Sequence, residues 1–60
     1  MIRIRELRLA SNVTQVQLAE MLNVSQPYIH DLENGNRKLN DDIATRIAKA
    51  LNVNVSELSD

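Results

Sequence analysis

The chain has 60 residues with one glycine, one proline and no cysteine, so neither disulfides nor thiolate metal sites can stabilise it. Hydrophobic residues make up 43% of the sequence, with Tyr28 as the single aromatic, which indicates one domain held together by packed aliphatic helices. Seven basic and eight acidic side chains give a formal net charge of −1, so contact with a polyanion would need a local basic patch.

Membrane insertion and secretion are not indicated. No apolar run approaches the ~20 residues of a membrane span, and the N-terminus lacks the apolar core of a signal peptide. We therefore expect a protein of a reducing, cytoplasmic compartment.

Hydrophobic spacing and capping residues predict five helices, over about residues 2–11, 14–22, 25–34, 40–51 and 55–59. In the first helix, Ile4 and Leu7 face inward at helical spacing. The second begins at Thr14, whose hydroxyl is expected to form a capping box with Gln17 three residues later.

The third helix is capped by Ser25, tolerates Pro27 in its first turn, and ends before Gly35, which suits a left-handed C-terminal position. In the fourth, Asn40 is the expected cap. A short fifth helix follows Asn54. Apolar residues at helical spacing in the fourth helix are expected in the core: Ile43, Ala44, Ile47, Ala48 and Leu51.

Three asparagines follow predicted helices, at Asn12, Asn23 and Asn52. Asparagine is the commonest substitute for glycine where a helix ends in a left-handed residue. These positions are therefore predicted to be left-handed helix junctions.

The segment from Thr14 to Gly35 combines two helices into one unit. Inward-facing residues on the first of these helices meet those on the second, and Val24 fills the corner between them. This is the layout of a helix-turn-helix. In DNA-binding proteins, the second helix of this motif enters the major groove. The inward-facing residues are Leu18, Ala19, Leu22, Ile29 and Leu32.

Over nearly its full length the chain resembles the phage repressor and Cro-like (Xre-like) helix-turn-helix family. Asparagine replaces the usual glycines at positions 12, 23 and 52, and Leu39 stands where proline is frequent. The resemblance is carried by Arg8, Gln15, Leu18, Ala19, Leu22, Val24, Ser25, Ile29, Leu32, Glu33, Asn34, Gly35, Arg37, Ile47, Ala48, Ala50 and Leu51.

This resemblance implies an all-α, compact five-helix domain of the lambda-repressor type over residues 1–60, with the helix-turn-helix formed by its second and third helices. It implies a bacterial or phage-type transcriptional regulator, a repressor, that binds double-stranded DNA in a sequence-specific way. Such proteins pair as symmetric dimers on a palindrome, with half-sites about 34 Å apart. The expected dimer surface is Val53, Val55 and Leu58.

Arg8 and Glu33 both flank inward-facing stripes of their helices, so a partly buried ion pair is the expected arrangement. In the resembled family this pair ties the first helix to the third. The alternative is two unrelated solvated charges.

The outward face of the third helix supplies the candidate base contacts, Gln26, Pro27, Tyr28 and Asp31. The Gln26 amide can pair bidentately with adenine, and Pro27 can pack against a thymine methyl group. Asp31 repels phosphates but can accept from cytosine. The structural alternatives are a solvated Gln26, simple helix initiation by Pro27, and packing of Tyr28 against the second helix.

Candidate phosphate contacts lie at the N-terminus of the second helix and after the third: Gln15, Asn34, Arg37 and Lys38. A solvated loop is the alternative for Arg37 and Lys38. His30 is interpreted as a surface histidine, and Arg46 and Lys49 are expected to face solvent.

The competing function is a protein-interaction module, or an antitoxin-type partner-binding protein, on the same fold. The acidic balance, Asp31 and a solvent-facing Leu9 and Val16 favour it. An enzyme is not predicted, because there is no cysteine, one histidine and no glycine-rich phosphate loop. No cofactor, metal or small-molecule ligand is expected.

Overall fold

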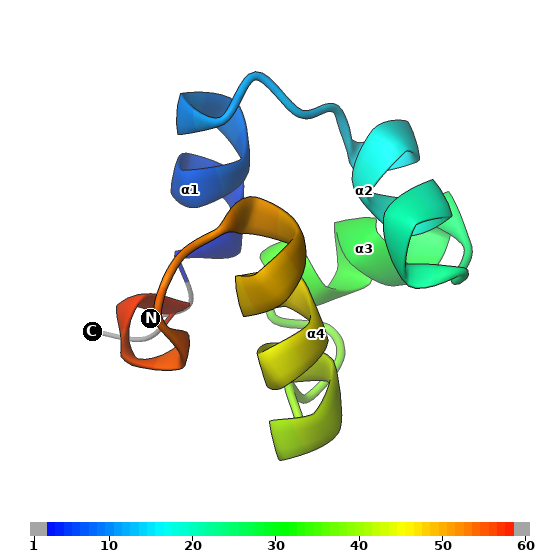
Figure 1. Cartoon of the computed structure of the whole chain (residues 1–60). Helices are drawn as coiled ribbons and strands as arrows, with labels where there is room; N and C mark the ends of the chain where they lie inside the picture. The colour runs from blue at the N-terminus through cyan, green and yellow to red at the C-terminus, as the bar shows by residue number, and fades with distance from the viewer. Residues whose placement is uncertain (1–2, 59–60) are drawn as a thin grey trace.

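The computed structural model describes residues 3–58, which form four α-helices and one short 3-10 turn. The helices are α1 (Ile4–Ala10), α2 (Gln15–Leu22), α3 (Gln26–Glu33) and α4 (Asp41–Leu51), and the 3-10 turn is η1 (Val55–Leu58). Within this range there is no strand, so the expected all-α class is confirmed. In Figure 1, α4 lies in the middle of the molecule. The α1 helix and η1 lie on one side of α4, α2 lies on the other side, and α3 lies behind α4.

The predicted count of five α-helices is not confirmed. The segment expected to be a helix over residues 55–59 is a single 3-10 turn, and residue 59 lies outside the described range. The first helix is shorter than the expected 2–11, because Ser11 is its C-terminal cap; residue 2 is also outside the described range. Ser25 and Asn34 flank α3 as caps rather than lying within it.

Side-chain caps fix where the helices begin. The Thr14 hydroxyl accepts from the Gln17 backbone N–H (3.0 Å) while the Gln17 side-chain oxygen accepts from the Thr14 N–H (2.9 Å), which completes the predicted capping box. Ser25 caps α3 and Asn40 caps α4 in the same way, each accepting from the N–H three residues on, at 3.2 and 2.9 Å. These contacts satisfy N–H groups that no helical carbonyl can reach.

The helix junctions turn on left-handed residues, as predicted. The backbone φ angles are +59° at Asn12, +58° at Asn23, +57° at Asn52 and +78° at Gly35. Asparagine tolerates this conformation because its short polar side chain can bond locally, whereas most L-residues lose about 1–2 kcal/mol there. The junctions therefore set the directions in which α2, α3 and α4 leave one another.

The core lies between α2, α3 and α4, and α1 and η1 cover one end of it. Ile4, Ile29 and Ile47 are fully buried, and the two ends of the described chain meet where the Arg3 N–H donates to the Leu58 carbonyl (2.8 Å). The longest helix has 11 residues, and no helix in the described range is long and apolar enough to cross a membrane.

Leu58 corrects one prediction. It was expected on a dimer surface but is 1% exposed within the single chain, where it packs into the core. The sequence pattern overlooked it because a one-turn segment has too few residues to reveal which side faces inward.

Arg46 was expected to face solvent, and the structure agrees with this only in part. Its residue is exposed, yet its guanidinium donates to the Leu22 carbonyl at the end of α2. This contact gives the C-terminal end of α2 a partner on α4 and joins the two helices.

Candidate nucleic-acid interface

The α2–α3 unit presents one side of α3 to solvent. Ile29 and Leu32 are 0% exposed, so the residues on the opposite side of α3 point away from the core. The turn before α3 is closed by the left-handed Asn23 and by the Val24 N–H, which donates to the Ala19 carbonyl (3.0 Å). The exposed side of α3 is therefore held at a fixed angle to α2.

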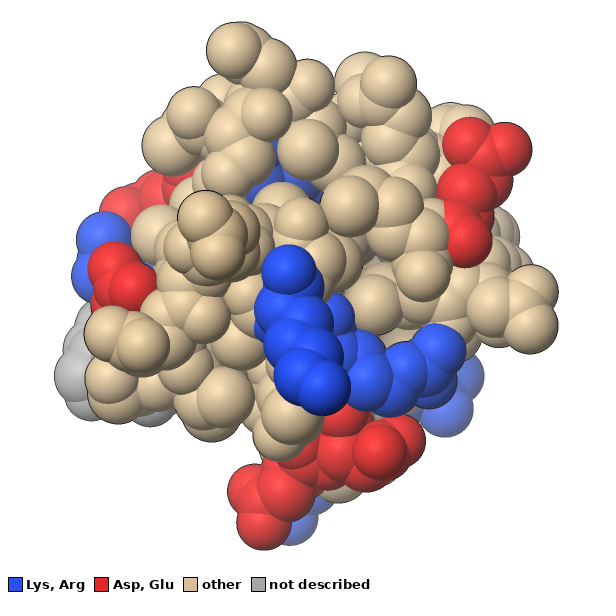
Figure 2. Space-filling model, viewed as in Figure 1, with Lys and Arg blue, Asp and Glu red and all other residues tan. Residues whose placement is uncertain are grey.

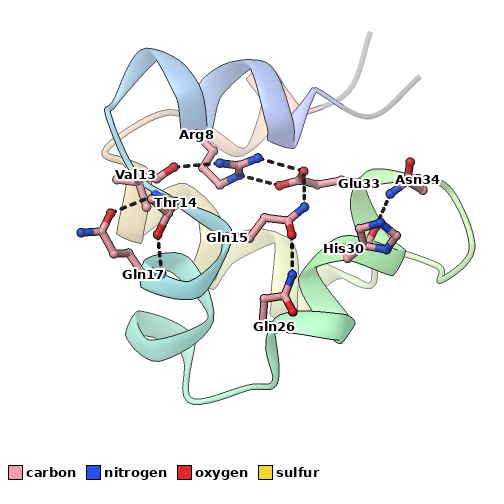
Figure 3. A network of polar contacts seen from close by, with 9 residues as sticks. All are labelled: Arg8, Val13, Thr14, Gln15, Gln17, Gln26, His30, Glu33 and Asn34. Atoms are coloured by element: carbon pink, nitrogen blue, oxygen red, sulfur yellow. Dashed lines mark hydrogen bonds and ion pairs between the residues drawn. The ribbon is translucent and has the colours of Figure 1, made fainter.

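The predicted ion pair between Arg8 and Glu33 is present and bidentate. Arg8 Nε lies 2.7 Å from Glu33 Oε2, and Arg8 Nη2 lies 3.1 Å from Oε1 (Figure 3). Arg8 Nη1 also donates to the Val13 carbonyl at 2.9 Å, a contact that side-chain periodicity could not reveal. The two side chains are 8% and 2% exposed, so the pair is buried and joins α1 to the end of α3.

The pKa of Glu33 reflects opposing effects. Burial raises the pKa of this carboxyl, but hydrogen bonds from Arg8 and Gln15 and the charges of Arg8 and Arg5 together hold it below its usual value of 4.5. Glu33 is therefore an ionised acceptor at neutral pH.

Acidification is expected to destabilise the natural chain more than the double variant Arg8→Met/Glu33→Gln. Because the folded-state pKa lies below 4.5, the ionised Glu33 stabilises the fold above that pH, and this contribution is lost as pH falls through the folded-state value. Thermal unfolding at pH values between about 7 and about 3 measures the effect. Parallel curves for the two proteins would contradict it.

Glu33 is also the start of a chain of amide contacts. Gln15 Nε2 donates to Glu33 Oε1 (3.0 Å), and Gln26 Nε2 donates to Gln15 Oε1 (2.7 Å) (Figure 3). The candidate phosphate contact Gln15 thus touches the candidate base contact Gln26. Sequence spacing carried no signal for this link, because it depends on the angle between α2 and α3.

The other candidate base contacts lie on or beside the exposed side of α3. Pro27 is exposed, whereas Tyr28 is half-buried and packs against the core. The alternative for Tyr28 was packing against the second helix, and its partial burial agrees with that alternative in part. The Asp31 side chain is 41% exposed, and its Oδ1 lies 3.8 Å from His30 Nδ1. All four candidate base contacts therefore lie on α3.

The candidate phosphate contacts after α3 differ in their surroundings. Asn34 Nδ2 donates to the His30 carbonyl (2.8 Å), so this side chain closes the end of α3 (Figure 3). The Arg37 guanidinium carbon lies 5.0 Å from the centre of the Tyr28 ring, a cation–π contact. Lys38, the next residue along the chain, is exposed.

The candidate dimer residues do not form one exposed set. Val55 is 46% exposed and Val53 is half-buried, while Leu58 is in the core. Val55 and Leu58 line a cavity of about 440 Å³ together with Leu39 and Ala44. Of the three candidate dimer residues, Val55 alone is exposed.

Comparison with known sequences decides the family. The sequence profile described as helix-turn-helix matches residues 4–58, which span α1 to η1. The chain belongs to this helix-turn-helix family. The sequence resemblance to Cro-like and Xre-like proteins is thereby confirmed.

Several curated proteins are similar to this helix-turn-helix chain. An uncharacterized HTH-type transcriptional regulator of Mycobacterium tuberculosis is 44% identical over 55 residues, which are 92% of this chain and 39% of that protein. The control protein C.BamHI of Bacillus amyloliquefaciens is 37% identical over 59 residues, covering 97% of this chain and 73% of that protein. The propionyl-CoA carboxylase regulator of Cereibacter sphaeroides is 33% identical over 57 residues, covering 95% of this chain and 12% of that protein.

A solved structure has the same helix arrangement. The clp gene regulator ClgR from C. glutamicum matches with a TM-score of 0.87 and 29% identity, over 92% of this chain and 71% of that one. The chain spans 39% of the length of the Mycobacterium relative, so the match covers only part of that protein.

Charge on this helix-turn-helix domain is mixed over the face shown in Figure 2. Basic side chains form a band across the middle of that face, over α4, and acidic side chains lie around it. Asp41 and Asp42 occupy the first turn of α4, where they stabilise the positive end of the helix dipole. The cations Arg37 and Lys38 instead follow α3 along the chain, and Arg37 lies over the ring of Tyr28 on that helix.

Proposed function

We propose that this chain is the DNA-binding domain of a transcriptional regulator, of lambda-repressor type over residues 1–60, which places α3 in the major groove of double-stranded DNA. The observation that carries this proposal is the exposed Gln26 amide at the start of α3, anchored through Gln15 to the buried Arg8–Glu33 pair. An anchored amide costs less entropy when it binds a base edge than a free one does. The Mycobacterium tuberculosis relative, which is named as an HTH-type transcriptional regulator, supports the same conclusion.

In this proposal the outward side of α3 reads bases. Gln26 binds a purine edge, Pro27 packs against a thymine methyl group, and Asp31 disfavours sequences that bring a phosphate or an acceptor against it. Tyr28, half-buried and covered by Arg37, contacts DNA through the edge of its ring.

The phosphate contacts fall on two sides of the same groove. Gln15 lies in the first turn of α2, where the helix N-terminus favours an anion. Asn34, Arg37 and Lys38 lie after the C-terminal end of α3. These contacts fix the position of α3 and carry the salt dependence of binding.

We further propose that the protein acts in the cytoplasm as a homodimeric repressor on a palindromic operator and has no enzymatic activity. A single α3 reaches only a few base pairs, so two copies with half-sites about 34 Å apart supply the required specificity. Val55 and the half-buried Val53 are the available apolar residues near η1 for this contact.

Selection from a pool of randomised duplexes at low salt tests the proposed function. The folded protein is expected to enrich one motif with two inverted half-sites. If circular dichroism shows a folded protein and no motif is enriched, the proposal is wrong. An enriched motif without inverted symmetry would contradict the dimer alone.

A protein-interaction module or antitoxin-type protein is the second candidate, and one observation favours it. The large apolar side chains of Leu9, Val16 and Met21 are 57%, 55% and 53% exposed, which leaves them available to a protein partner. Duplex affinity that changes little with salt, together with DNA-independent capture of one partner, would favour this candidate.

Tyr28→Leu is expected to weaken duplex binding about two- to fivefold, which corresponds to the ~0.5–1 kcal/mol of an exposed cation–π contact. The substitution keeps the apolar contact with the core but removes the ring that holds Arg37 near the phosphates. Tyr28→Phe is the matched control, because it retains the ring and should bind like the natural chain. Fluorescence anisotropy with a selected duplex measures both, and an equal loss in Tyr28→Phe would show that the hydroxyl, not the ring face, matters.

A further inference from the structure

The contacts around Glu33 have a direction that follows from charge. An ionised carboxylate only accepts hydrogen bonds, so each group that contacts Glu33 must donate. Arg8 donates to both carboxylate oxygens, and Gln15 donates its Nε2 to Oε1. The Gln15 amide therefore has one possible orientation, with its nitrogen towards Glu33 and its oxygen away from it.

The orientation of Gln15 fixes the orientation of the next amide. Gln15 Oε1 points at Gln26 and can only accept, so Gln26 presents its Nε2 at 2.7 Å. The direction is transmitted from a buried carboxylate, through a half-buried amide, to an exposed one (Figure 3). Gln26 then keeps its oxygen and one N–H free for a ligand.

A free oxygen beside a free N–H on Gln26 complements the major-groove edge of adenine but not that of guanine. Adenine offers an N6 donor and an N7 acceptor in the major groove, which complements this pair of groups. Guanine offers two acceptors, O6 and N7, and its O6 would face the Gln26 oxygen. The reversed amide would present two N–H groups and suit guanine instead.

We propose that Glu33 is a positioning residue for base preference: by orienting Gln15 and hence Gln26, it makes the protein select adenine over guanine at the base pair that Gln26 contacts. This inference rests on the proposed DNA-binding function and adds the role of Glu33 in setting the direction of the Gln15 and Gln26 amides. The buried Arg8–Glu33 pair thus has a role in specificity besides joining α1 to α3. Arg8 donates to both oxygens of the Glu33 carboxylate, which is ionised at neutral pH, so the direction of the amide contacts stays fixed there.

Gln15→Met tests the proposal, with Gln17→Met as its matched control. Both glutamines lie in the first turn of α2, but among the described residues Gln17 bonds only to Thr14 and contacts neither Glu33 nor Gln26. The measurement is the ratio of affinities for two duplexes that differ by adenine or guanine at the position whose preference disappears in Gln26→Ala. Because the ratio is taken within each protein, the effect on affinity of any phosphate contact that Gln15 makes cancels.

The natural chain and Gln17→Met are expected to prefer adenine by about tenfold, within the range of a bidentate base contact. Gln15→Met should bind both duplexes within about twofold of each other, because its Gln26 amide can reverse. The double variant Arg8→Met/Glu33→Gln should lose the preference in the same way, since the neutral amide that replaces the Glu33 carboxylate can donate or accept. A folded Gln15→Met protein that keeps the tenfold preference overturns the inference.

A second measurement needs no DNA. Scalar coupling across hydrogen bonds in NMR should connect Gln26 Nε2 with Gln15 Cδ, and coupling from Gln15 Nε2 to Gln26 Cδ would overturn the inference. Failure of the natural chain to select any sequence would overturn the proposed function and the base preference together. Selection of a motif with an unchanged adenine preference in Gln15→Met would overturn the inference alone.

Discussion

Arg8→Met alone is expected to lower the free energy of unfolding by about 3–5 kcal/mol, because it leaves the Glu33 carboxylate buried without its charged partner. The substitution also removes the donor to the Val13 carbonyl. A domain of this size has about 3–5 kcal/mol of stability from its core, so the variant should be largely unfolded at about 25 °C. Urea denaturation followed by circular dichroism measures the change.

Two controls separate this effect from a general loss of helix α1. Arg5→Met removes an exposed arginine of the same helix whose charge has the smallest of the effects on the Glu33 pKa, and it should change stability by no more than about 0.5 kcal/mol. The double variant Arg8→Met/Glu33→Gln removes both charges and should recover most of the loss. If Arg8→Met and Arg5→Met had equal effects, the buried pair would not be the link between α1 and α3.

Gln26→Ala is expected to reduce affinity for the selected operator about 5- to 150-fold, the ~1–3 kcal/mol of one bidentate base contact, while binding to unrelated duplexes is unchanged. The side chain is exposed at the start of α3, so the fold should be unaffected. Its slope of log affinity against log salt should equal that of the natural chain, because no phosphate contact is lost.

Lys38→Gln gives the contrasting pattern and serves as the control. It should weaken binding to all duplexes alike and reduce the salt slope by about one. If Gln26→Ala instead weakened all sequences equally, Gln26 would be a backbone contact and α3 would lie differently in the groove.

Local sequence signals were sufficient for much of the fold. The Thr14–Gln17 capping box and the left-handed Asn12, Asn23 and Asn52 were predicted because each depends on residues within one turn of the chain. The Arg8–Glu33 pair was also predicted, since helical periodicity placed both residues at the edge of the core.

Features that depend on distances between elements were not predicted. Leu58 was expected at a dimer surface but is buried, because the direction of η1 is set by its packing on α4 and by the Arg3–Leu58 backbone contact. The reach of Arg46 to the end of α2 depends on the spacing of two helices. Of the candidate site, the residues on α3 followed from periodicity, whereas the contact of Gln15 with Gln26 required the angle between α2 and α3.

The central claim is that α3 reads DNA sequence through Gln26. Parallel selection of randomised duplexes by the natural chain and by Gln26→Ala tests it most directly. We expect the natural chain to enrich a motif with an adenine at one position of each half-site, and Gln26→Ala to enrich the same motif without preference at that position. Enrichment of an identical motif by both proteins, or of no motif by the folded natural chain, would contradict the claim.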